Sequence, residues 1–117
     1  MTINLQDVGG PSAGMMFALG IIDKLAQPSL TGGRHVAGTG EIDPAGAVGP
    51  IGGIVQKLIG ARDNGATLFL APAGNCNEVV GHIPPGLTVA RVATLDDALK
   101  ALADVRAGRT PAGCTTT

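Results

Sequence analysis

Apolar positions recur with two different periods along this chain, and the changes of period divide it into expected strands and helices. Over residues 2–6 polar and apolar residues alternate, which is the pattern of a half-buried strand. Residues 67–71 instead form an apolar run, which favours a buried strand. Asp, Pro and Gly within residues 43–46 predict a type I turn that closes a hairpin. The expected strands cover residues 2–6, 35–42, 47–48, 67–71 and 88–92.

Helical spacing of apolar residues predicts helices between these strands. Residues 12–26 are apolar on nearly every face, so this helix is expected to be buried, with Ser12 at its N-terminus. A second helix is expected over residues 53–64, and Gly65 suits the left-handed conformation that commonly follows a helix. A short helix is expected within residues 75–82.

The last expected helix has the clearest start signal. Thr94 and Asp97 occupy the two positions of a capping box, and the leucines that follow recur at helical spacing. Residues 107–117 are expected to be a disordered tail, which leaves one domain over residues 1–106. Strands and helices alternate irregularly around one antiparallel hairpin, which indicates an α+β fold rather than a doubly wound sheet.

The amino-acid composition bears on which kinds of molecule the protein is expected to bind. The chain has 117 residues, of which 44% are hydrophobic, enough for one domain with a core of Ala, Val, Ile and Leu. The net charge is −1, and the only aromatic side chains are two phenylalanines. Nucleic-acid binding is therefore not expected, because both a basic stripe and a set of base-stacking side chains are missing.

The cysteines and the absence of an evident signal peptide say less about function than the composition does. Cys76 and Cys114 lack the spacing of metal ligands, so no metal or other cofactor is expected in this chain. The two thiols could pair in an oxidising compartment or could both be free. Residues 13–22 are too short an apolar stretch to cross a bilayer, and the first residues do not form a signal peptide.

The candidate chemistry begins at Ser12, which lies between glycines where an expected strand meets an expected helix. Serine becomes a nucleophile when a base removes its proton. Free backbone N–H groups at a helix N-terminus can hold the oxyanion of an acyl transfer. Gly10, Pro11 and Ala13 are the residues expected to shape this oxyanion and substrate-backbone site around the serine.

Lys57 is the candidate base. Ile54 lies three residues before it and Ala61 four after it, so an apolar stripe borders the lysine on its helix. Such surroundings favour the neutral amine that a general base requires. The ordinary alternatives are an N-capping serine and a solvated surface lysine, and each residue taken alone favours them.

The sequence also contains residues for two other catalytic arrangements. Gly-x-Ser-x-Gly also occurs at the nucleophile elbow of α/β-hydrolases, and Ser12, Asp63 and His82 follow the required chain order. The chain is much shorter than that architecture and lacks a series of βα units. A glycosidase-like pair of Glu41 and Asp43 is not favoured, because the expected turn already explains Asp43.

Taken together, the motifs resemble a known family. Residues 7–14, 38–42 and 46–57, continuing through 65–72 and Asn75, resemble the proteolytic domain of Lon proteases, family S16. The resemblance implies an α+β fold of the ribosomal protein S5 domain 2-like type and a serine endopeptidase acting on proteins or peptides. It also implies homo-oligomers, commonly hexameric rings.

The same resemblance implies roles for individual residues. Ser12 would be the nucleophile and Lys57 the general base of a Ser–Lys catalytic dyad. Thr39, within a Gly-Thr-Gly-Glu segment, would orient the lysine amine.

Some details are similar to one branch of the family, the membrane-anchored proteins of Gram-positive bacteria that join a PDZ domain to a Lon-like domain. Val8-Gly9-Gly10, Val36-Ala37 and Asn75-Cys76 carry this similarity. It implies an ATP-independent protease domain outside the cytoplasmic membrane, with an anchor and a PDZ domain upstream. A cytoplasmic location is the alternative.

Two departures from the family pattern give a further hypothesis. Gly9 stands where ATP-dependent Lon proteases usually have an acidic residue, and Asp7 is two residues further back. Strands that precede the serine motif in a full proteolytic domain are also missing, so the domain is expected to be N-terminally truncated. The alternative function is therefore a catalytically inactive assembly module.

Overall fold

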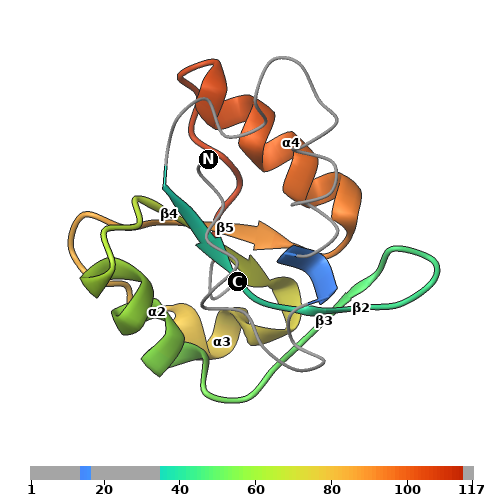
Figure 1. Cartoon of the computed structure of the whole chain (residues 1–117), viewed down its shortest axis with the longest axis horizontal. Coiled ribbons are helices and arrows are strands. Elements are labelled where there is room, and N and C mark those ends of the chain that lie inside the picture. The colour runs from blue at the N-terminus through green and yellow to red at the C-terminus, as the bar shows by residue number, and fades with distance from the viewer. Residues whose placement is uncertain (1–13, 17–34, 115–117) are drawn as a thin grey trace.

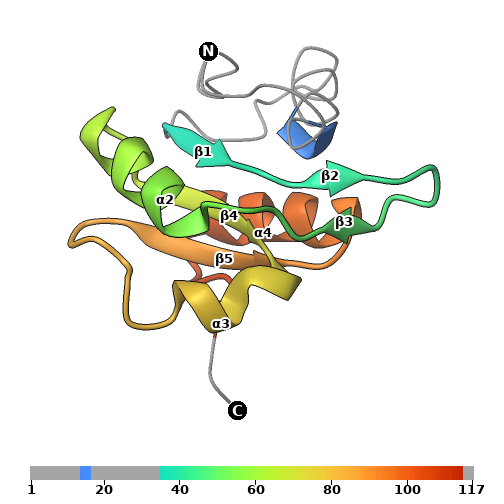
Figure 2. The same ribbon diagram turned by 90° about the horizontal axis from the view of Figure 1, so that it is seen from below.

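The computed structural model describes residues 14–16 and 35–114. Within them, β1 (Val36–Gly38), β4 (Leu68–Pro72) and β5 (Thr88–Val92) form a parallel sheet in the order β1-β4-β5. Ala37 is level with Phe69, and Phe69 with Val89. Figure 2 shows the strands side by side, with a two-stranded hairpin beyond one end of the sheet.

Helices cover both faces of this sheet. The helix α2 (Ile54–Asp63) lies on one face together with α3 (Cys76–Val79), which follows the 3₁₀ turn η3 (Ala73–Asn75). The helix α4 (Leu95–Arg106) packs on the other face. Figure 1 shows the sheet between α4 on one side and α2 and α3 on the other.

Side chains alternate between the two faces of the sheet along each strand, so a hydrophobic core forms on each face. Successive strand side chains point to opposite faces, so Leu68 and Leu70 face α4 while Phe69 and Ala71 face α2. The α4 side also buries Met15 and Met16. The core on the α2 side contains Ala37, Ile54, Leu58, Ala61, Ala66, Phe69, Ala71, Val79, Leu87 and Val89.

The hairpin consists of β2 (Glu41–Ile42) and β3 (Val48–Gly49), paired antiparallel. Its turn is closed as expected, because Asp43 Oδ1 accepts hydrogen bonds from the N–H groups of Ala45 and Ala47, both at 2.9 Å. The predicted strand over residues 35–42 is instead divided in two. Gly40, with a φ of 151°, turns the chain from the parallel sheet into the hairpin.

Several predicted elements are confirmed. The buried run at residues 67–71 forms β4, residues 88–92 form β5, and residues 53–64 form α2 with one residue trimmed at each end. The capping box at α4 has both of its side-chain hydrogen bonds. The expected strand over residues 2–6, and all but residues 14–16 of the expected first helix, lie outside the described residues.

The fold class is confirmed in its coarser form. The described residues have mixed helix and strand content, and their central sheet is parallel with helices on both faces. The apolar run Leu68–Pro72 is entirely buried, as parallel strands between two helical layers are.

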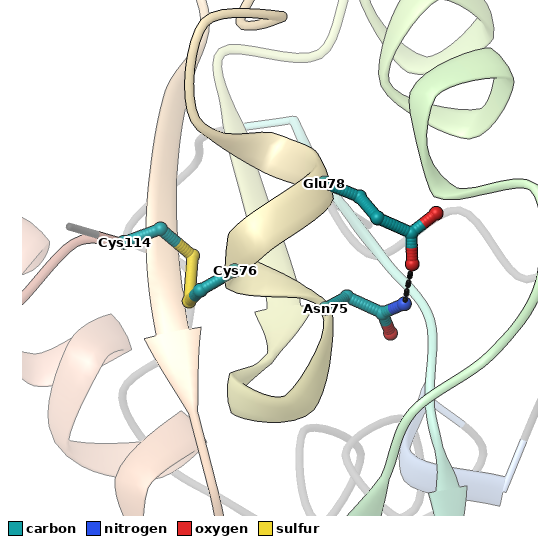
Figure 3. Close-up of a disulfide and its surroundings, with 4 residues drawn as sticks. All are labelled: Asn75, Cys76, Glu78 and Cys114. Atoms are coloured by element: carbon teal, nitrogen blue, oxygen red, sulfur yellow. Dashed lines mark hydrogen bonds between the residues drawn. A yellow bond between two sulfur atoms is a disulfide. The ribbon is translucent and has the colours of Figure 1, made fainter. Parts of the chain in front are cut away.

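Residues 107–114 also differ from the disordered tail predicted for residues 107–117. The N–H of Arg91 donates to the carbonyl of Ala112 at 2.8 Å, so this segment lies along β5. Cys114 then forms a disulfide with Cys76 of α3, with a Cα–Cα distance of 5.0 Å (Figure 3). Of the two states left open for the cysteines, the structure has the paired one.

Candidate active site

Lys57 lies in the first part of α2, half-buried. Its backbone N–H donates to the carbonyl of Gly53 at 3.2 Å, which closes the first turn of the helix. Ile54 and Ala61, the neighbours expected to form an apolar border, are both buried. This part of the prediction is confirmed, because Lys57 lies on the margin of the core and not on the exposed face of α2.

Two hollows meet at Lys57. The smaller, about 190 Å³, lies between α2 and the sheet and is lined by Ala37, Gly38, Lys57, Gly60, Ala61 and Phe69. The larger, about 550 Å³, is lined by Lys57, by the loop before α2, by Gly74 and Asn75, and by Glu41 and Glu78. Among the described residues, Lys57 therefore lines both hollows.

Thr39 follows β1 directly and is 4% exposed. Its backbone N–H donates to the carbonyl of Leu70 at 3.2 Å, which extends the parallel pairing by one step. Its neighbour Gly38 shares the smaller hollow with Lys57. The structure thus brings the Thr39 segment and Lys57 to the same region, while the orienting role of the threonine stays a prediction.

The chain just after the predicted nucleophile also lies beside the Thr39 segment. Gly14 is two residues after Ser12, and a Cβ added at Gly14 would be 2.7 Å from the Cγ2 atom of Ile42. The N–H of Met15 donates to the carbonyl of Gly40 at 3.1 Å. Residues 14–16 are therefore packed tightly against the chain that follows β1.

The remaining residues predicted for the nucleophile site are not covered. Gly10, Pro11, Ser12 and Ala13 lie outside the described residues, so their roles and the Ser12–Lys57 pairing stay predictions.

One residue at the site had no role from the sequence. Asn75 is 1% exposed, and its side-chain amide makes two hydrogen bonds to the backbone of Ile51 in the loop before α2, at 2.8 and 2.9 Å. It also donates to Glu78 Oε1 at 3.1 Å (Figure 3). Its signal in the sequence was its place in the family resemblance. The 24 residues that separate it from Ile51 concealed the contact.

Asp63 and His82, two residues of the alternative hydrolase triad, lie away from this site. Asp63 ends α2 and is exposed, and His82 is exposed with its Nδ1 3.0 Å from the carbonyl oxygen of Glu78. Neither residue lines the two hollows at Lys57.

Residues 14–16 and 35–114 contain no group of three or more His, Cys, Asp or Glu side chains that could hold a metal ion. In the same residues, every helix is too short or too polar to cross a membrane.

Similarity to known proteins shows which family the chain belongs to. Residues 7–104 match the family model of the Lon protease (S16) C-terminal proteolytic domain. This match covers most of the chain, so the chain belongs to that family.

Individual relatives agree with the family. The chain is 40% identical to Lon protease 2 of Herpetosiphon aurantiacus over 93 aligned residues. The aligned region covers 77% of this chain and 11% of that relative. The chain is 35% identical over 94 residues to Lon protease 1 of Bacillus subtilis, covering 78% and 12%. With Lon protease 2 of Bacillus subtilis it shares 34% identity over 92 residues, covering 79% and 16%. The chain thus spans a small part of the length of these relatives.

Proposed function

We propose that this chain is the proteolytic domain of a serine endopeptidase with a Ser12–Lys57 catalytic dyad. The observation that carries the proposal is the position of Lys57 at the margin of the core, where two hollows meet beside the Thr39 segment. Membership of the Lon proteolytic family supports it. The finer fold name, ribosomal protein S5 domain 2-like, belongs to the same proposal.

The reaction follows from the chemistry of the pair. Lys57, as the general base, takes the proton of Ser12 Oγ while that oxygen attacks the substrate carbonyl. Backbone N–H groups of Gly10 and Ala13 hold the oxyanion, and Pro11, which has no N–H, shapes the turn before the serine. The Lys57 ammonium then gives its proton to the leaving amine. Water, deprotonated by Lys57, hydrolyses the acyl-enzyme, and the proton returns to Ser12. Thr39 orients the amine through these steps.

The test is substitution in the full-length protein. We expect Ser12→Ala to abolish peptide cleavage and Lys57→Met to lower kcat by about 10²–10⁴-fold, the usual contribution of a general base. Lys100→Met is the matched control, because Lys100 is an exposed lysine of α4. Full activity of Lys57→Met in a folded protein would rule out the dyad.

The surroundings of the domain form a second part of the proposal. We infer an ATP-independent protease outside the cytoplasmic membrane, with an upstream membrane anchor and PDZ domain, that assembles as a hexameric ring. The Cys76–Cys114 disulfide supports an oxidising compartment, because disulfides persist mainly in such compartments. Trapping thiols with an alkylating agent in intact cells tests this, and a pair found fully reduced would favour the cytoplasm.

A second candidate function is an inactive assembly module, and the glycine at position 9 favours it. A serine-directed phosphonate separates the two. Stoichiometric labelling of Ser12 in the full-length protein supports the peptidase, whereas an unlabelled, folded and oligomeric protein supports the module.

A further inference from the structure

We propose that Asn75 is a positioning residue for Lys57, acting through the loop of residues 50–53 from which α2 begins. This inference rests on the proposed function of Lys57. Asn75 lies 18 positions after Lys57 in the sequence. Its side chain forms hydrogen bonds with Ile51 in this loop and with Glu78.

The amide of Asn75 holds the loop by its backbone. Asn75 Oδ1 accepts from the N–H of Ile51 at 2.9 Å, and Asn75 Nδ2 donates to the carbonyl of Ile51 at 2.8 Å. The second proton of Nδ2 is directed to Glu78 Oε1 at 3.1 Å. The Asn75 side chain is 1% exposed and its bonds to Ile51 are partly buried, so removing the amide leaves partly buried polar groups of the loop without these partners.

Gly74, the residue before Asn75, contacts Pro50, the residue before Ile51 in the loop. A Cβ added at Gly74 would be 3.0 Å from the Cβ of Pro50 and 3.2 Å from its Cγ, so the proline ring packs directly on the Gly74 backbone. Two consecutive residues of η3 therefore fix two consecutive residues of the loop, which sets both its position and its direction.

The loop in turn sets the start of α2. Only Gly52 and Gly53 separate Ile51 from the helix, and Gly53 has a φ of 72°. Glycines restrict the backbone least, and Gly53 has no side chain to cap the helix. The first turn, closed by the bond from Lys57 N–H to the Gly53 carbonyl, therefore depends on an external anchor, which Asn75 provides.

The anchor is itself held in place. Cys76, the residue after Asn75, is joined by the disulfide to Cys114, whose segment is bonded to β5 through Ala112 and Arg91. Figure 3 shows the disulfide and the Asn75–Glu78 pair on opposite sides of the α3 segment. The disulfide fixes η3 and α3 on one side while Asn75 holds the active-site loop on the other.

The experiment compares variants of the full-length protein with a fluorogenic peptide substrate. Asn75→Leu has a side chain of similar size without hydrogen bonds, and Leu99→Ala is the control, because Leu99 is a partly buried residue of α4 on the opposite face. Both proteins are assayed at a temperature at which circular dichroism shows them folded.

We expect Asn75→Leu to lower kcat by about 100-fold, the usual effect of a misplacement near 1 Å, and to shift the midpoint of the pH profile of kcat. Amide hydrogen exchange at Lys57, whose N–H closes the first turn of α2, should accelerate in this variant and not in Leu99→Ala. Leu99→Ala should keep the kcat and the pH profile of the wild type, since it only weakens the core.

A milder variant covers the case in which Asn75→Leu does not fold. Asn75→Ala removes the same bonds without adding bulk or charge, and water from the adjoining hollow can replace some of them, so we expect a smaller loss of kcat, about tenfold. A folded Asn75 variant with the kcat and pH profile of the wild type overturns this inference alone. A wild-type protein without Ser12-dependent cleavage instead overturns the proposed function together with it.

Discussion

Glycines decide how closely the segments around the site approach one another. Gly38 ends β1, and a Cβ added there would be 2.9 Å from Met16 Sδ and 3.0 Å from both the Cβ and the carbonyl oxygen of Leu70. The sequence shows a glycine in a strand. Only the packed structure shows that the strand β4 and residues 14–16 both press against it.

This closeness gives a prediction at the scale of single residues. We expect Gly38→Ala to destabilise the fold by about 1–3 kcal/mol, because the added methyl overpacks a filled space. Gly60→Ala is the matched control. It lies within α2 with nothing near the added Cβ, and alanine should stabilise the helix by about 0.5–1 kcal/mol. Urea unfolding of both variants measures the difference, and equal effects of the two would contradict the packing described here.

At the scale of elements, α4 has the most complete local signal. The Thr94 side chain accepts from the N–H of Asp97 at 3.1 Å, and Asp97 Oδ2 accepts from the N–H groups of Ala93 and Thr94 at 2.9 and 3.3 Å. Aspartate replaces the usual glutamate of a capping box and still reaches both groups. Local sequence therefore predicted this helix start correctly.

The cap gives the prediction at this scale. Thr94→Ala is expected to lower the free energy of unfolding by about 1 kcal/mol, because the N–H of Asp97 in the first turn of α4 loses its acceptor. Thr94→Ser keeps the hydroxyl and should lose much less. Chemical denaturation of the two variants tests the cap, and an equal loss in both would show that the hydroxyl does not contribute.

At the scale of the whole molecule, the disulfide joins the C-terminal segment to α3 across 38 residues. The enclosed part of the chain includes β5 and α4, so the bond restricts a large part of the unfolded chain. Together with the bond from Arg91 N–H to the Ala112 carbonyl, it explains why residues 107–114 follow the sheet.

Removal of this link is the prediction for the whole molecule. The loss of loop entropy predicts that replacing both cysteines by serine destabilises the fold by up to about 4 kcal/mol for a loop of 38 residues. Thermal unfolding of the oxidised wild type and of the double variant measures this. Reduction of the wild type by dithiothreitol should reproduce the effect of the substitutions, and a reduced protein as stable as the oxidised one would contradict it.

The sequence by itself determined the local elements and the family. Apolar periodicity placed α2, β4, β5 and α4 within one or two residues, because each has an uninterrupted pattern with a clear start or stop signal. The motifs around Thr39 and Lys57 indicated the Lon family, which the family model confirms. Lys57 was expected beside an apolar stripe, since neighbours on one helix are fixed by its period.

The tertiary structure alone decided what depends on distant partners. The parallel sheet, the division at Gly40, the Asn75–Ile51 contact and the cysteine pairing each join segments that no local pattern connects. Local patterns carry the period of a helix or strand but not the identity of what it packs against. The position of the 50–53 loop, and with it the start of the helix that bears Lys57, is therefore a property of the folded molecule.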